Sequence, residues 1–202
     1  MFRVQSSRFL KLAAAALAFV SHAAFAAPVT FSGALTASDP TFHRPLTLTS
    51  LSGVGTNASY DVYDFYVTAA GTYSMEATSF SATGADTFFA LYGGAFNPAA
   101  PLSNLLEVDD DDGPGSLSLI SRALQADIQY YLVFTTFNNG VFGNYTGVFD
   151  TVSGGGQVVL GAVGTPGDGP GTPGEVPEPG TLALLPLALL GMRLARRRHP
   201  VG

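Results

Sequence analysis

Short runs of β-branched and aromatic residues, separated by turn-forming residues, recur through the middle of the chain. Residues 29–35 alternate apolar residues with small or polar ones, which is typical of a strand with one buried face. The breaks between runs contain Gly, Pro, Asn and Asp, which tolerate the backbone angles of tight turns. Such runs predict strands at residues 29–35, 45–51, 60–68, 72–80, 87–92, 117–122, 129–137 and 145–152.

Strands at this spacing predict an all-β fold, specifically a jelly-roll-like two-sheet sandwich of about eight strands. The chain contains no Cys, so a hydrophobic core has to hold the sheets together without disulfides. Asp61 and Asp64 interrupt the third run, so we expect an exposed start before a buried face at Phe65 and Val67. Residues 128–134 are almost wholly apolar and predict a central strand.

The first 26 residues have the three parts of a secretory signal peptide. Basic residues within the first eleven positions precede an apolar run over residues 12–20, and Ala24 and Ala26 form an Ala-x-Ala site. This run is shorter than the roughly 20 residues that a membrane-spanning helix needs. We therefore expect cleavage after Ala26 and export of the remaining chain.

Four segments follow from these patterns: a signal peptide at 1–26, a β-sandwich domain at 27–160, a linker at 161–175 and a C-terminal signal at 176–202. The linker consists largely of Gly and Pro, which supply no side chains for a core. We expect it to hold the sandwich away from whatever the C-terminal segment is attached to.

The C-terminal segment combines a short motif, an apolar helix and a basic tail. The motif is Val176, Pro177, Glu178 and Pro179, and a Leu- and Ala-rich stretch at 181–192 leads to Arg193 and Arg196–Arg198. The basic tail should stay cytoplasmic, which leaves the motif on the outer face. The apolar stretch is at the short end of what spans a bilayer, so it predicts a transient membrane anchor.

This order of motif, helix and arginine tail resembles the PEP-CTERM sorting signal of Gram-negative bacteria. The resemblance implies processing near the motif by an exosortase-type enzyme, after transient anchoring in the inner membrane. It also implies a destination at the cell surface or in an extracellular matrix of exopolysaccharide or biofilm. The alternative is an ordinary tail anchor that is never cut.

An acidic run, Asp109, Asp110, Asp111 and Asp112, precedes a Gly/Pro turn and is the candidate metal site. Carboxylate oxygens on a flexible loop suit Ca²⁺. The spacing fails the EF-hand pattern, because Leu119 falls where the bidentate Glu belongs. A solvated acidic turn without metal is the alternative interpretation.

The middle of the chain also resembles the bacterial pre-peptidase C-terminal domain, a small jelly-roll-like β-sandwich. The stretches that carry this resemblance are residues 63–67, 70–73, 86–92, 110–113 and 130–133. The resemblance implies an Asp/Gly loop at the acidic run; some such domains bind calcium or help an attached enzyme engage a polymer.

Charge and residue counts exclude several functions. Residues 27–176 contain fourteen Asp and Glu but only two Arg, so the domain should repel nucleic acid. His43 is the one histidine between the two terminal signals, and no Gly-x-Ser-x-Gly elbow is present, so we predict no enzyme.

The leading hypothesis is a non-enzymatic exported protein associated with the surface or matrix. The alternative is a carbohydrate-binding module, assisted by calcium, and a hydrolase is third. For a carbohydrate site, Phe142 or Tyr145 would stack on sugar rings, although packing explains them better.

Overall fold

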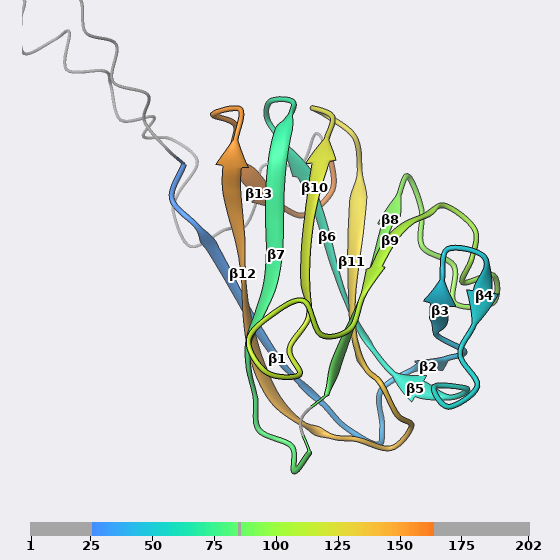
Figure 1. The fold of residues 1–202 in the computed structure, drawn as a ribbon. Helices are drawn as coiled ribbons and strands as arrows, with labels where there is room; N and C mark the ends of the chain where they lie inside the picture. Colours follow the sequence, from blue (N-terminus) through green and yellow to red (C-terminus); the bar gives the residue numbers. More distant parts are fainter. Residues whose placement is uncertain (1–25, 85, 164–202) are drawn as a thin grey trace, which may run out of the picture.

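Two antiparallel sheets packed face to face dominate the computed structural model, which describes residues 26–84 and 86–163 (Figure 1). One sheet has four strands in the order β1-β12-β7-β10, and the other has five in the order β13-β6-β11-β8-β9. The predicted all-β, sandwich-like fold is therefore confirmed.

The four-stranded sheet comprises β1 (Val29–Leu35), β12 (Gly143–Ser153), β7 (Gly71–Phe80) and β10 (Leu119–Leu124). The five-stranded sheet comprises β13 (Val158–Leu160), β6 (Asp61–Val67), β11 (Tyr130–Thr136), β8 (Thr87–Gly93) and β9 (Leu105–Asp109). Two small ribbons complete the described strands: β2 (Thr41–Phe42) with β5 (Ala58–Ser59), and β3 (Pro45–Thr47) with β4 (Ser50–Leu51).

The prediction of one strand over residues 45–51 was wrong. Thr47 pairs with Ser50 across a two-residue turn, and their hydroxyl oxygens lie 2.7 Å apart, so this segment is the β3–β4 hairpin. The predicted number of strands was also too low, because β2, β5, β9 and β13 were not anticipated. These strands have two to five residues, which is too short for a clear alternation.

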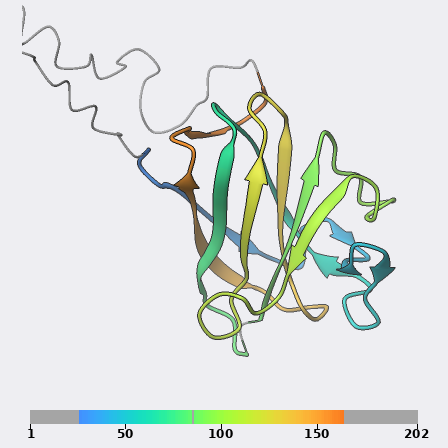
Figure 2. The ribbon, with the colours of Figure 1, turned by 45° about the horizontal axis from the view of Figure 1, so that its top comes forward.

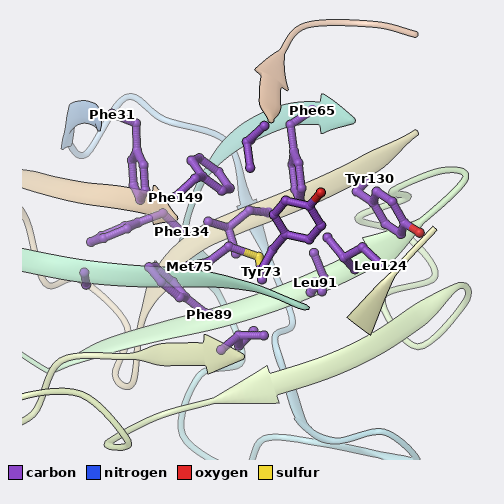
Figure 3. Close-up of a cluster of buried hydrophobic side chains, with 14 of the residues drawn as sticks. Phe31, Phe65, Tyr73, Met75, Phe89, Leu91, Leu124, Tyr130, Phe134 and Phe149 are labelled. Atoms are coloured by element: carbon purple, nitrogen blue, oxygen red, sulfur yellow. The ribbon is translucent and has the colours of Figure 1, made fainter. Parts of the chain in front are cut away.

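Aromatic side chains from both sheets fill the space between them (Figure 3). Phe65 and Val67 of β6 are fully buried, as predicted from the pattern of that run. β11 lies between β6 and β8, which confirms its predicted central position. Burying each such side chain contributes about 1.5–3 kcal/mol, so this cluster is the main source of stability in a chain without disulfides.

Tyr145 joins the two sheets through its ring and its hydroxyl. Its ring stacks on Phe134 with centroids 3.7 Å apart, and its hydroxyl donates to Asp61 Oδ2. The hydroxyl of Tyr63 lies 2.7 Å from that of Tyr145. Burial raises the pKa of Asp61, and the hydrogen bond from Tyr145 lowers it in part. The polar atoms that the core encloses here therefore satisfy one another.

A second hydrophobic cluster covers the outer face of the five-stranded sheet. Phe42 from β2 and Tyr60, which follows β5, pack with Tyr92 of β8 and Val133 of β11. This cover explains why β8 is buried along both faces. It also places the two small ribbons on the flank of the sandwich beside β9, with β2 and β5 toward the end where β8 begins and β9 ends (Figure 1).

Both ends of the described chain lie toward the opposite end of the sandwich (Figures 1 and 2). Within the described chain, no helix has the length and apolar character that a membrane span needs. The predicted signal peptide up to residue 25, the linker from residue 164 and the sorting signal at 176–202 lie outside the described residues.

Candidate functional site

The acidic run follows β9, and its four aspartates have different surroundings. Asp109 accepts hydrogen bonds from the backbone N–H groups of Leu119, at 2.7 Å, and Asp112, at 3.4 Å. Ser118 Oγ donates to the backbone carbonyl of Asp110 at 3.1 Å. Asp109 therefore stabilises the segment between β9 and β10, because its Oδ2 accepts both of these backbone hydrogen bonds.

Three other carboxylates converge at this end of the sandwich. One oxygen each from Asp86, Asp110 and Asp111 lies within 4.8 Å of the other two. Asp86 directly precedes β8, and the antiparallel pairing of β8 with β9 brings it beside the end of β9. The structure thus brings together two of the four predicted residues and adds Asp86, while Asp109 and Asp112 lie outside this acidic centre.

Buried polar atoms without a partner occur within the acidic centre and on its neighbour Arg44. Among the described residues, three buried side-chain atoms have no hydrogen-bond partner: Asp86 Oδ1, Asp110 Oδ1 and one terminal nitrogen of Arg44. Because burying a polar atom without a partner costs about 1–3 kcal/mol, a bound cation, or a proton shared between Asp86 and Asp110 in a hydrogen bond, would stabilise this arrangement.

Arg44 is the fully buried neighbour of the acidic centre. Its guanidinium carbon lies 4.1 Å from the centroid of the Phe88 ring and 4.5 Å from that of Phe137. Its Nε donates to the carbonyl of Phe137, and one terminal nitrogen donates to that of Pro45, both at 2.9 Å. Burial lowers the pKa of Arg44, and the charges of Asp110 and Asp86 counteract part of that shift.

The electrostatics of the acidic centre favour a cation. Burial raises the pKa of Asp110 to about 6, and the negative charges of Asp111 and Asp86 add to the shift. Burial, followed by the charge of Asp111, also raises the pKa of Asp86. Three ionised carboxylates beside one guanidinium leave two negative charges uncompensated, which a divalent cation would neutralise.

The donor set fits calcium better than a transition metal. It offers carboxylate oxygens alone, which suit hard cations such as Ca²⁺, whereas zinc sites use His and Cys. Calcium takes six to eight oxygen ligands, so water or backbone carbonyls would complete its shell.

Arg44 and Asp86 were not predicted as parts of this centre. Asp86 is isolated in sequence, about two dozen residues before the acidic run, and only the β8–β9 pairing brings it close. Arg44 had one available signal: it is one of just two arginines in an otherwise acidic domain.

Residues considered for other chemistry have structural contacts. His43 Nε2 lies 2.7 Å from the carbonyl oxygen of Ser52, and these two residues flank the two strands of the β3–β4 hairpin. Tyr145 is buried in the core, so the packing interpretation is confirmed for it, whereas Phe142 is 41% exposed.

No protein-family model matches this chain, and no curated protein matches it either. The structure itself shows an all-β sandwich with an acidic centre, and the two family resemblances in the sequence remain predictions.

Proposed function

We propose that this chain is a non-enzymatic, exported protein of the cell surface or extracellular matrix, sorted through its C-terminal motif. The observation that carries this proposal is the order of its segments. A signal peptide and a Pro-Glu-Pro motif, with its apolar helix and arginine tail, enclose a single β-sandwich. An exosortase-type enzyme would process the protein during its transient stay in the inner membrane.

Mass spectrometry of the mature protein tests this sorting route. We expect a C-terminus near the motif and loss of Arg196–Arg198. Glu178→Ala combined with Pro179→Ala should retain the tail and fractionate with membranes, because the motif is destroyed. Glu175→Ala, a change just outside the motif, is the matched control and should be processed normally. A mature wild-type protein that still carries the arginine tail would contradict the proposal.

The chain connectivity supports a jelly-roll-like arrangement of the sandwich. From β6 to β8 and again from β9 to β13, successive strands alternate between the two sheets. This arrangement is consistent with the proposed resemblance to pre-peptidase C-terminal domains.

A calcium-assisted carbohydrate-binding module is the second candidate, and the acidic centre favours it. A calcium ion held by Asp86, Asp110 and Asp111 would have coordination positions left for the hydroxyl groups of a sugar. The partner would be the exopolysaccharide of the same cell. Retention of the protein on that polysaccharide in Ca²⁺ but not in EDTA would support this candidate over the first.

Calorimetric titration separates the metal site from a solvated acidic turn. At pH 7.5 we expect wild-type protein to bind Ca²⁺ and to melt at a higher temperature when it is loaded. Asp110→Asn combined with Asp111→Asn should lower the affinity for Ca²⁺ by about 100-fold, because it removes two carboxylate ligands. Losing even a residue that only hydrogen-bonds a metal ligand costs about 10- to 100-fold in affinity. Asp112→Asn is the matched control, since Asp112 belongs to the same run but not to the acidic centre. Equal binding by both variants would eliminate the site.

A further inference from the structure

The connection between β11 and β12 contains an Asn-Gly dipeptide, Asn139 and Gly140, which is exposed to solvent. The backbone nitrogen after an asparagine can attack the side-chain carbon Cγ and close a five-membered ring, and glycine hinders this attack least because it has no side chain. Gly140 has φ +70°, and nothing lies within 4 Å of a side-chain carbon built on it. Among the described residues, its N–H has no hydrogen-bond partner. The attacking nitrogen is therefore free.

A second dipeptide capable of the same ring closure, Asp112 with Gly113, is blocked in the fold. The N–H of Gly113 donates to the carbonyl of Leu117 at 2.8 Å, and a side-chain carbon at Gly113 would overlap that carbonyl. Its nitrogen is thus engaged and closely covered. Of the two dipeptides in the described part of the chain, the structure leaves only the one at Asn139 with a free nucleophile.

The side-chain amide of Asn139 is held against the loop that precedes β5 (Figure 1). Its Oδ1 accepts a hydrogen bond from the backbone N–H of Asn57 at 2.8 Å, and its Nδ2 donates to Thr56 Oγ1 at 3.0 Å. A donor at the amide oxygen stabilises the negative charge that develops there when Cγ is attacked. The hydroxyl of Thr56 lies beside the departing nitrogen, where it can supply a proton.

We propose that Asn139 is a self-modification site, which the folded protein converts to a mixture of aspartate and isoaspartate. The nitrogen of Gly140 attacks Cγ of Asn139, so that a C–N bond forms, the bond from Cγ to Nδ2 breaks, and the proton of the attacking nitrogen leaves with ammonia. Water then opens the succinimide ring at either carbonyl. The product carries a carboxylate, so the domain gains a negative charge and Thr56 becomes the donor in their contact. This inference goes beyond the proposed function and depends on neither the sorting signal nor a metal.

Peptide mapping by mass spectrometry, with chromatographic separation of the aspartate and isoaspartate forms, tests the proposal. The full-length protein is incubated at pH 7.5, either folded or unfolded in urea. We expect residue 139 to react about tenfold faster in the folded protein, because the unfolded chain keeps Gly140 but loses both contacts of the amide. Asp112 should instead isomerise more slowly in the folded protein, since the N–H that follows it is bonded.

Variants of Thr56 test the contact at the departing nitrogen. Thr56→Val should slow the reaction of the folded protein by about tenfold, whereas Thr56→Ser, which keeps the hydroxyl, should react at close to the wild-type rate. Thr41→Val is the matched control, because Thr41 Oγ1 donates to the side chain of Asn57 and not to Asn139. Melting temperatures check that the variants are folded, and their rates in urea should all agree.

Two results would overturn the proposal. The first is a residue 139 that reacts no faster in the folded protein than in urea, as expected if its hydrogen bonds only immobilise the amide. The second is a faster reaction in the folded protein that Thr56→Val and Thr41→Val both leave unchanged, since the hydroxyl of Thr56 would then contribute nothing.

Discussion

Arg44 performs two roles at the scale of single residues. Its guanidinium satisfies backbone carbonyls of two segments, and its charge offsets part of the negative charge of Asp86 and Asp110. Gly55 allows this arrangement, since a side-chain carbon at that position would overlap the arginine. One residue therefore connects the β3–β4 hairpin with the acidic centre.

Replacing Arg44 by Met should destabilise the fold by about 3 kcal/mol, because it removes one partner from a buried charged group. Phe137 and Pro45 would lose the donor to their carbonyl oxygens. Urea denaturation monitored by tyrosine fluorescence measures the change. Arg44→Lys keeps the charge but loses the planar group between the rings, so we expect an intermediate loss. A Met variant as stable as the wild type would show that the guanidinium contributes nothing net.

The sequence predicted the acidic run but not the composition of the acidic centre. Asp110 and Asp111 were recognisable because they stand beside a Gly/Pro turn. Asp86 and Arg44 come from distant parts of the chain, and their meeting depends on strand pairing and on a side chain inserted between two rings. Local patterns carry no information about either contact.

At the scale of strands, prediction worked where alternation was long enough to observe. β6 and β11 were recognised with the correct buried face and position, since each has seven residues within a strongly apolar or alternating run. β9 was missed because all its residues are partly buried, which is typical of an edge strand without a clear periodicity. β3 and β4 were merged because the turn between them contains Leu48 and Thr49, neither of which is a usual turn residue.

Gly147 sets the fit between β12 and β1. A side-chain carbon at this position would overlap the ring of Phe31, which belongs to the core. Gly147→Ala should therefore destabilise the protein by about 1–3 kcal/mol, the usual cost of overpacking. The midpoint of chemical denaturation measures this loss. Gly53→Ala is the control, because nothing lies within 4 Å of the added carbon, and it should change stability by less than about 0.5 kcal/mol.

At the scale of the whole molecule, the sandwich has two functionally different ends. Both chain ends lie toward one of them, whereas the acidic centre, where β8 begins and β9 ends, lies toward the other. If the C-terminal segment tethers the protein, the acidic centre faces away from the tether. This polarity could not be predicted from the sequence, because it depends on the order of strands within both sheets.

The short edge strand β13 has a mechanical consequence for a tethered protein. It pairs with β6 over three residues, and the contacts further along the chain include those of Gly161 with Asp64 and Gln129 and of Val163 with Gln129. A pull on the C-terminal side loads these few bonds one after another, starting from Val163. Shear along β7 and β12 would instead load many bonds at once. Tension should therefore peel β13 away first, and the two remaining layers would keep their shape at that force.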